Sequence, residues 1–540
     1  MSPSIGLITL NAKFIHSSLS IRYLRNVTQQ EGFDNVWIQE FVISQPIWKV
    51  AAEILSNKPD ILGISVYIWN RGQSFELIER LKKQDPSIRI VIGGPEVSFD
   101  MTSTDQYTVI AGEGEKKWTE FLEHFQKKTL PSNEKLKDWE SYGESLPELT
   151  PAYIKEDLSQ LKNRIVYLET SRGCPYLCSF CLSALDKTVR FFDDHTIHQQ
   201  INLLIKGGVT KIKFVDRTFN LKPLHMKELM SWLSKFDGVA FHFEVVGDLL
   251  TKDLLDFLET VPKGMFQFEL GVQTTDQSSQ EKIKRKQNNK KLFFAIERLI
   301  SSNLIHIHCD LIFGLPGETM DDILNSFEEV CLLRPHELQL GFLKFLPGAP
   351  IKKIIGDYGY EYQSTPPYEF ISNNDLSASQ LNYLKKFEDV FDIFYNSKRF
   401  RFTVQRLLKK LPAVNIFNLL LEHMETNNIF NQPHALNAQY KIIHDTFTLN
   451  KDPVDLDILR LDYLYAQRVY RLPRFLEIEE ARQKTWGGDK KTPLLPFLHT
   501  IHIDKGDAEI QPATSPQFCA VVHDTESSGY MSPPSLNWVS

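Results

Sequence analysis

The chain has 540 residues, of which 42% are hydrophobic and 24% charged, with a formal net charge of −7 and an isoelectric point near 6.1. This length predicts two to four globular domains. The acidic balance argues against a general nucleic-acid coat or a binder of anionic membranes. No apolar run reaches the roughly 18 residues needed to cross a bilayer, and the N-terminus lacks the pattern of a secretory signal. We therefore expect a cytoplasmic protein that has neither a membrane nor a nucleic acid as its partner.

Residues 1–125 predict a separate α/β domain. Five short apolar runs alternate with amphipathic stretches, which is typical of a doubly wound, Rossmann-like parallel sheet with helices on both faces. The expected strands are Ile5–Leu10, Val36–Phe41, Ile61–Val66, Ile88–Ile92 and Tyr107–Ile110.

Polar and glycine residues stand at the carboxyl ends of three of these expected strands, where parallel sheets bind their ligands. Glycine lets backbone approach a ligand closely, although tight turns alone would also explain the glycines. The candidate ligand-binding residues of this domain are Ser65, Gly93, Gly94, Glu113, Gly114 and Glu115.

Residues 126–159 predict a linker, because prolines and mixed charges replace any regular period. Residues 160–370 predict a second α/β domain, in which six apolar strands alternate with helical segments. The expected strands are Ile165–Glu169, Lys211–Val215, Phe241–Val246, Phe266–Gly271, Ile305–Phe313 and Glu337–Leu343.

Three of the six cysteines lie within eight residues directly after the first strand of this second domain. Cys174, Cys178 and Cys181 have the spacing C-x3-C-x2-C, with no fourth cysteine or histidine nearby. A structural zinc site would be one ligand short. Three thiolates suit a 4Fe–4S cluster that keeps one iron open. A knuckle of buried thiols and an incomplete zinc loop are the alternatives. The scattered Cys309, Cys331 and Cys519 indicate no disulfide framework.

At this loop the chain resembles the radical S-adenosylmethionine (radical SAM) superfamily. The resemblance includes Arg172-Gly173 before the cysteines and the aromatic Phe180 before the third one. It implies a partial (β/α)6 barrel whose 4Fe–4S cluster binds the amino and carboxylate groups of SAM at the open iron, with Phe180 near the adenine. It also implies an external electron donor of the flavodoxin or ferredoxin type.

The same resemblance assigns further SAM contacts after the later strands. Asp216 corresponds to acceptors for the methionine ammonium, whereas Gln273 and Arg285 correspond to groups that hold the ribose and the carboxylate. The segment from Cys309 to Glu318 resembles the family's G-x-P-G-E stretch beside the adenine, with residues 314–318 at the motif positions. The basic run around Arg285 also fits a solvated helix face. The implied SAM-binding residues are Phe180, Asp216, Glu244, Gln273, Arg285, Asp310 and Gly314.

The N-terminal domain resembles the cobalamin-binding domain that precedes many radical SAM barrels. The motifs that carry this resemblance are the segments 90–95 and 109–115, which match that family's fourth and fifth strand ends. Better-known cobalamin proteins carry D-x-H-x-x-G after the first strand. Around His16, this chain has Phe14 and Leu19 at the Asp and Gly positions. We therefore expect that His16 is not a cobalt ligand.

Residues 371–500 predict a mostly helical extension, with helices at Asp375–Phe394, Phe402–Leu411, Ile416–Met424 and Asp455–Tyr465. It resembles an uncharacterised extension found behind cobalamin-type radical SAM proteins, and we expect it to cover the barrel mouth. Residues 501–540 predict a weakly ordered tail.

The function predicted from the sequence is reductive cleavage of SAM at the cluster, followed by cobalamin-dependent methylation of an unactivated carbon. The substrate, a small molecule or a peptide, has no recognisable code in the sequence. A cobalamin-assisted radical rearrangement and a cobalamin-binding sensor with an inactive barrel are the alternatives. A methylthiotransferase is disfavoured, because no cysteine precedes Cys174 to hold an auxiliary cluster.

Overall fold

The structure is a computed structural model. It describes residues 3–127, 151–430, 435–466, 472–477, 484–485, 493–504, 507–522 and 535–539. Most of the expected linker at 126–159 therefore lies outside the described residues.

The N-terminal domain is a five-stranded parallel sheet in the order β2-β1-β3-β4-β5, with a separate apolar core on each face. This order is the flavodoxin-like form of the doubly wound fold. All five predicted strands are confirmed. Its strands are β1 Ile5–Asn11, β2 Val36–Val42, β3 Ile61–Ser65, β4 Arg89–Gly93 and β5 Thr108–Ile110, and its helices are α1 Ser20–Gln30, α2 Ile47–Ser56, α3 Arg71–Gln84 and α4 Glu115–Gln126.

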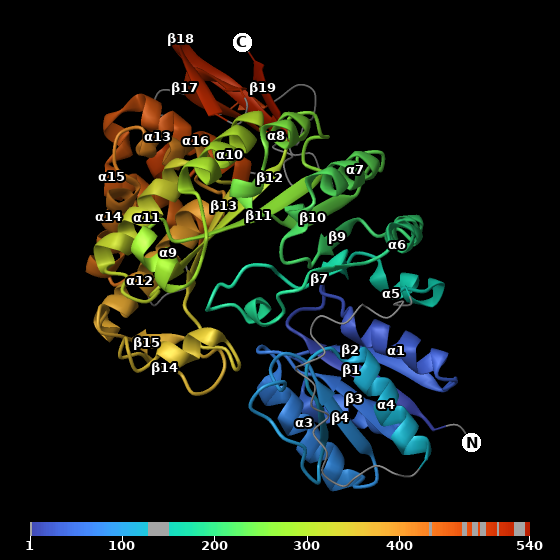
Figure 1. Ribbon diagram of the computed structural model, residues 1–540. Coiled ribbons are helices and arrows are strands. Elements are labelled where there is room, and N and C mark those ends of the chain that lie inside the picture. The colour runs from blue at the N-terminus through green and yellow to red at the C-terminus, as the bar shows by residue number, and fades with distance from the viewer. Residues whose placement is uncertain are drawn as a thin grey trace.

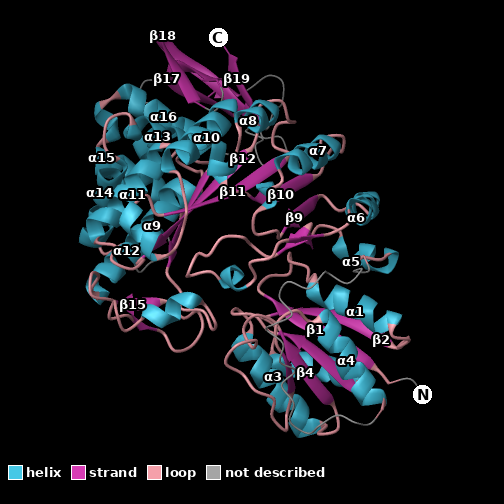
Figure 2. Ribbon diagram, in the orientation of Figure 1, coloured by secondary structure: helices cyan, strands magenta, loops and turns pink. Residues whose placement is uncertain are grey.

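The second domain is a six-stranded parallel sheet in the order β13-β12-β11-β10-β9-β6, which confirms the expected partial barrel. Helices cover its outer face (Figure 2). Its strands are β6 Ile165–Leu168, β9 Lys211–Phe214, β10 Ala240–Glu244, β11 Phe266–Gln273, β12 His306–Phe313 and β13 Glu337–Phe342, and its principal helices are α6 Asp194–Lys206, α7 Pro223–Leu233, α8 Lys252–Leu258, α9 Gln277–Lys282, α10 Asn289–Ser302 and α11 Met320–Leu332.

Each barrel strand has one apolar and one polar face, because successive side chains point to opposite sides. In β10, Phe241 and Phe243 are fully buried in the core between strands and helices, and Phe243 stacks on Phe214 of β9 at 4.7 Å between ring centroids. The alternate residues of β10, His242 and Glu244, belong to the opposite face. The strands thus present ionisable groups to the barrel interior.

Both edges of the partial barrel are covered by other parts of the chain. At the β6 edge, the Ile165 amide donates to the carbonyl of Ile15 (2.8 Å) and the Ser17 amide donates to the carbonyl of Ile165 (3.2 Å). At the β13 edge, the side-chain amide of Asn396 accepts from the amide of Leu338 (3.0 Å) and donates to its carbonyl (2.9 Å). Backbone groups at both edges of the sheet thereby gain hydrogen-bond partners. The loop after β1 of the N-terminal domain serves as the partner of β6.

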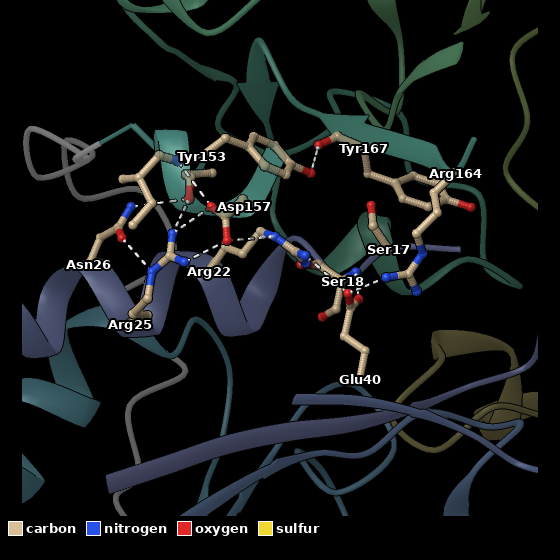
Figure 3. A network of polar contacts seen from close by, with 12 residues as sticks. Ser17, Ser18, Arg22, Arg25, Asn26, Glu40, Tyr153, Asp157, Arg164 and Tyr167 are labelled. Carbon is tan, nitrogen blue, oxygen red and sulfur yellow. Dashed lines mark hydrogen bonds and ion pairs between the residues drawn. The ribbon is translucent and has the colours of Figure 1, made fainter. Parts of the chain in front are cut away.

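Buried ion pairs surround this contact between the domains (Figure 3). Glu40 of β2 accepts from Arg22 of α1 (3.0 Å) and from Arg164 before β6 (2.7 Å), and the side chains of all three are at most 6% exposed. Beside them, Arg25 donates two hydrogen bonds to Asp157 (2.6 and 2.8 Å). Desolvated charges of this kind require their partners, so the two domains are held in one arrangement.

The described helices behind the barrel include all those predicted from the sequence and one that was not predicted, α15. They are α12 Ala378–Phe391, α13 Arg401–Leu408, α14 Ala413–Thr426, α15 Leu436–Phe447 and α16 Pro453–Ala466. They pack on α11, where Phe327 meets Phe391 and Phe417 edge to face. Lys385 of α12 also lies over the ring of Phe342 at the end of β13. Coverage of the barrel mouth by this helical region stays a prediction.

The described part of the predicted weakly ordered tail, residues 501–540, contains strands. In its described part, β17 (Pro493–Asp504) pairs antiparallel with β18 (Asp507–Val522), and β18 pairs with β19 (Ser535–Val539). The sheet is joined to α16, because the amides of Leu498 and His499 donate to the buried carboxylate of Asp457 (2.7 and 2.8 Å). In the described part of the chain, no helix is both long and apolar enough to span a membrane.

Replacing Glu40 by Gln should lower the free energy of unfolding by about 3–5 kcal/mol, because Arg22 and Arg164 lose a buried counter-charge. Urea denaturation measures the change. Burial opposes ionisation of Glu40, but Arg22 and Arg164 lower its pKa below the usual 4.5. Its contribution is therefore complete above pH 4.5 and is lost as the pH falls further.

The matched control is Glu76→Gln, which removes an exposed partner of Arg80 one helical turn away. That change should cost less than about 1 kcal/mol. Equal losses for the two variants would contradict the role of Glu40.

Candidate functional site

The cysteine loop begins in a short antiparallel hairpin, β7 (Ser171–Arg172) with β8 (Arg190–Phe191). Gly173 has φ +92°, and a Cβ there would lie 2.2 Å from the carbonyl oxygen of Thr188, so the position requires glycine. The amide of Cys174 donates to Asp186 (2.9 Å), and the amide of Cys181 donates to Cys178 (3.0 Å). The backbone thus folds the loop back on itself.

The three thiols are available for a cluster. All are free, with Cys174 and Cys178 buried and Cys181 half-buried. Among the described residues, no three His, Cys, Asp or Glu side chains converge as they would around a single ion. A cubane places its three thiolates on separate iron atoms, so this donor set fits a cluster better than a mononuclear zinc.

Asp216 lies beneath the loop and is fully buried. It accepts hydrogen bonds from the Thr170 amide (2.9 Å), the Thr170 hydroxyl (2.6 Å) and the Ser171 hydroxyl (2.6 Å). Burial raises its pKa, and these donors oppose that shift. The carboxylate is thus engaged in holding the start of the cysteine loop, and its contact with the SAM ammonium stays a prediction.

Arg285 lies beside the cysteines. One Nη donates to Cys178 Sγ (3.8 Å), the other donates to the carbonyl of Gly271, and Nε donates to Gln287 (2.8 Å). A bidentate contact with the SAM carboxylate would have to replace some of these bonds. Gln273 has φ +67° at a bulge in β11, and its buried Oε1 has no partner among the described residues. An unsatisfied buried acceptor at a strand end fits a contact with the ribose hydroxyls.

Glu244 is the last residue of β10, Asp310 lies within β12, and Gly314 follows the end of β12. Burial raises the pKa of Glu244 to about 7, against the opposing effect of Arg217, whose guanidinium is 4.0 Å away. Burial also raises the pKa of Asp310. Gly314 has φ +84°, and a Cβ there would lie 2.2 Å from the ring of Phe370. Phe180 is half-buried against the core.

A set of ionisable groups on the same strands was not predicted from the sequence. Glu269 of β11 accepts from Lys213 of β9 (3.1 Å) and pairs with His242 of β10 (3.0 Å). Burial opposes ionisation of Glu269, yet these two partners lower its pKa. The alternation of large apolar with ionisable residues in Ala240–Glu244 and Phe266–Gln273 was the available signal, and it defines a polar barrel interior.

The predicted cobalamin residues of the N-terminal domain lie together at the carboxyl ends of its strands. Gly94 has φ +113°, and a Cβ there would lie 2.4 Å from the carbonyl oxygen of Val66, so the loop needs glycine. Gly93 precedes it at the end of β4. The buried hydroxyl of Ser65 lies 3.1 Å from that of Ser20.

Glu113 and Glu115, which flank Gly114 after β5, are engaged with the barrel domain. Arg172 of β7 donates to Glu115 (2.7 Å) and to Glu113 (3.4 Å), and Arg190 of β8 also donates to Glu113 (3.1 Å). Their partners are thus the hairpin that begins the cysteine loop. A contact of these carboxylates with the corrin stays a prediction.

His16 belongs to the loop that covers β6. Its Nδ1 lies 2.7 Å from the hydroxyl of Tyr167, and burial lowers its pKa. Its position is therefore explained by contact between the domains, and the expectation that it does not bind cobalt stays a prediction.

Comparison with protein families assigns three regions of the chain. Residues 5–122 match the B12 binding domain, residues 168–330 match the radical SAM superfamily, and residues 356–489 match a protein family of unknown function, DUF4080. The chain combines an N-terminal B12-binding domain with a radical SAM domain. These domains imply cobalamin, a 4Fe–4S cluster and SAM as cofactors.

Two curated relatives are methyltransferases. The cobalamin-dependent radical SAM methyltransferase TokK of Streptomyces tokunonensis is 26% identical over 340 residues, which cover 57% of this chain and 50% of TokK. The 2-(S-pantetheinyl)-carbapenam-3-carboxylate methyltransferase of Streptantibioticus cattleyicolor is 24% identical over 352 residues, which cover 57% of this chain and 50% of that enzyme. The chain thus spans about half the length of these relatives.

Two solved structures share the fold. The cobalamin-dependent SAM radical enzyme OxsB, with aqua-cobalamin and SAM bound, has a TM-score of 0.57 at 15% identity and covers 86% of this chain and 79% of its own. The radical SAM methyltransferase TsrM from Kitasatospora setae, with cobalamin and a [4Fe-4S] cluster, has a TM-score of 0.55 at 16% identity, covering 70% and 82%. The fold class predicted from the sequence is thereby confirmed.

Replacing Cys174, Cys178 or Cys181 singly by Ala should abolish the cluster. A 4Fe–4S cube that keeps one iron for SAM needs a protein thiolate on each of its other three irons. Iron and sulfide per chain after anaerobic reconstitution measure this. Serine in place of Cys309 or Cys331, both fully buried on β12 and α11, is the matched control and should leave the iron content unchanged. Loss of iron in either control would show that the ligands are misassigned.

Glu244 should make SAM binding dependent on pH. Its pKa of about 7 means that the carboxylate fraction rises across neutrality, and only the ionised form attracts the cationic cofactor. Affinity should increase roughly tenfold between pH 6 and 8. Calorimetric titration of the reconstituted protein measures it. In Glu244→Gln, only the dependence due to SAM itself should remain, and an unchanged profile would exclude Glu244 from the site.

Proposed function

We propose that this protein is a cobalamin-dependent radical SAM methyltransferase that methylates an unactivated carbon. When bound, the cluster and SAM supply a radical that removes hydrogen, and cobalamin supplies the methyl group. The protein binds and orients these groups and shields them from water. Support comes from the family matches and from the methyltransferases among the relatives. The proposed functional units are residues 1–125 and 160–370.

The observation that carries the proposal is the way the two domains face each other. Three loops at the carboxyl-end edge of the N-terminal sheet contact the barrel domain. The loop after β1 pairs with β6, Glu96 after β4 accepts from Tyr368, and Glu115 after β5 pairs with Arg172. In parallel sheets this edge is the ligand-binding edge. A corrin bound there would lie on the side of the N-terminal domain that is next to β7, the strand that leads into the cysteine loop (Figure 1).

The polar barrel interior is the proposed substrate site. Lys213, His242 and Glu269 form a hydrogen-bonded group on three adjacent strands, below the level of the cysteine loop. Such groups bind a polar small molecule or a peptide side chain by directed hydrogen bonds. An electron donor of the flavodoxin or ferredoxin type is proposed for the cluster. The proposed compartment is the reducing cytoplasm, because thiolate ligands must stay reduced.

The methyltransferase proposal makes a specific product prediction. Carbon methylation consumes two SAM molecules per turnover, one cleaved to 5′-deoxyadenosine and one converted to S-adenosylhomocysteine. Reconstituted protein that carries cluster and cobalamin, supplied with SAM and a reductant under anaerobic conditions, should form both products. Chromatography with mass spectrometry quantifies them.

The other functions give different product patterns. 5′-Deoxyadenosine without S-adenosylhomocysteine would favour a cobalamin-assisted rearrangement, and neither product would favour a sensor with an inactive barrel. The Cys178→Ala variant is the control, because the products that it fails to form are those that depend on the cluster. Absence of S-adenosylhomocysteine from the wild type would overturn the methyltransferase proposal.

A further inference from the structure

The region of unknown function begins with a hairpin at the barrel mouth. Its strands β14 (Glu361–Tyr362) and β15 (Phe370–Ser372) pair antiparallel. The hairpin continues the end of β13, because the Phe370 amide donates to the carbonyl of Leu343 (3.1 Å). Figure 1 shows this hairpin (yellow) on the side of the barrel that faces the N-terminal domain.

One end of the hairpin region contacts the predicted SAM-binding loop, residues 314–318. The hydroxyl of Tyr360 donates to the carbonyl of Gly314 (2.8 Å). The ring of Phe370 occupies the space that a Cβ at Gly314 would need. Both aromatic residues are buried, with exposed fractions of 6% and 1%. The conformation of this glycine is therefore fixed by the hairpin region.

The other side contacts the predicted corrin-binding loop, residues 93–98. The hydroxyl of Tyr368 donates to Oε1 of Glu96, and both residues are buried. Arg71 of α3 binds the same carboxylate oxygen (3.2 Å), which fixes Glu96 from within its own domain. Glu96 follows Gly93 and Gly94 directly after Pro95, so a restraint on Glu96 restrains the loop expected to lie under the corrin.

We propose, resting on the proposed function, that the β14–β15 hairpin positions the corrin-binding loop relative to the SAM-binding loop, with Tyr368 as the positioning residue. The path between the loops is short. It runs from Glu96 to Tyr368, through two residues of backbone to Phe370, and from there to Gly314. Reactions between two bound groups are sensitive to displacements of about 1 Å. This assigns a role to the start of the region that matches a family of unknown function.

The first test is hydrogen exchange in the cofactor-free protein. Tyr368→Phe keeps the ring and removes only the hydroxyl that binds Glu96. Exchange of the amides in 94–98 should become faster, whereas exchange in β1 should stay unchanged. Tyr362→Phe is the matched control, because the Tyr362 hydroxyl makes no hydrogen bond within the described part of the chain. Wild-type exchange of 94–98 in Tyr368→Phe would overturn the proposal.

The second test is titration with hydroxocobalamin, followed by absorbance, of protein that carries its cluster. Tyr368→Phe should bind the corrin about tenfold more weakly, as expected for a lost hydrogen bond to a charged group. Iron and sulfide per chain should be unchanged, and Tyr362→Phe should bind as the wild type does. Affinity within twofold of the wild type would overturn the positioning role. If the wild type binds no corrin, the proposed function fails, and hydrogen exchange still decides whether Tyr368 holds the loop.

Discussion

The arrangement of this molecule depends on two buried carboxylates at the contact between its domains. Glu40 binds Arg22 and Arg164, and Asp157 binds Arg25, away from water. Ions in such surroundings are costly unless each keeps its partner, so a small rotation of one domain would leave charges unpaired. A reaction that passes between two separate cofactors needs a fixed distance between them, and these ion pairs supply that constraint. The Arg172–Glu115 pair adds to it directly beside the cysteines.

A large part of the fold could be predicted from the sequence because its signals are local. Strands of alternating or continuous apolar residues follow from burial, and the cysteine spacing follows from the size of a cluster within one loop. The glycines at 94, 173 and 314 are local signals too, because the backbone there adopts positive φ. The described strands β17 and β18 were missed, because the prolines in both of them argue against strands.

Contacts between distant segments could not be predicted in this way. Glu113 and Glu115 follow a strand end, and from sequence alone they fit a ligand contact. Their ion pairs with Arg172 and Arg190 exist only because one domain is docked on another. Asp216 likewise has the position expected of a SAM ligand, yet its hydrogen bonds hold Thr170 and Ser171. In each case the residue type was informative and the partner was set by tertiary structure.

The contacts between the domains hold the proposed corrin-binding edge of one domain facing the cysteine loop of the other. Reduced protein that carries both the 4Fe–4S cluster and cob(II)alamin has one paramagnetic centre in each domain, so pulsed dipolar electron resonance measures the distance between them. The expected result is a single narrow distance in the wild type that broadens in Glu40→Gln. A broad distribution in the wild type, or no dipolar coupling, would contradict it.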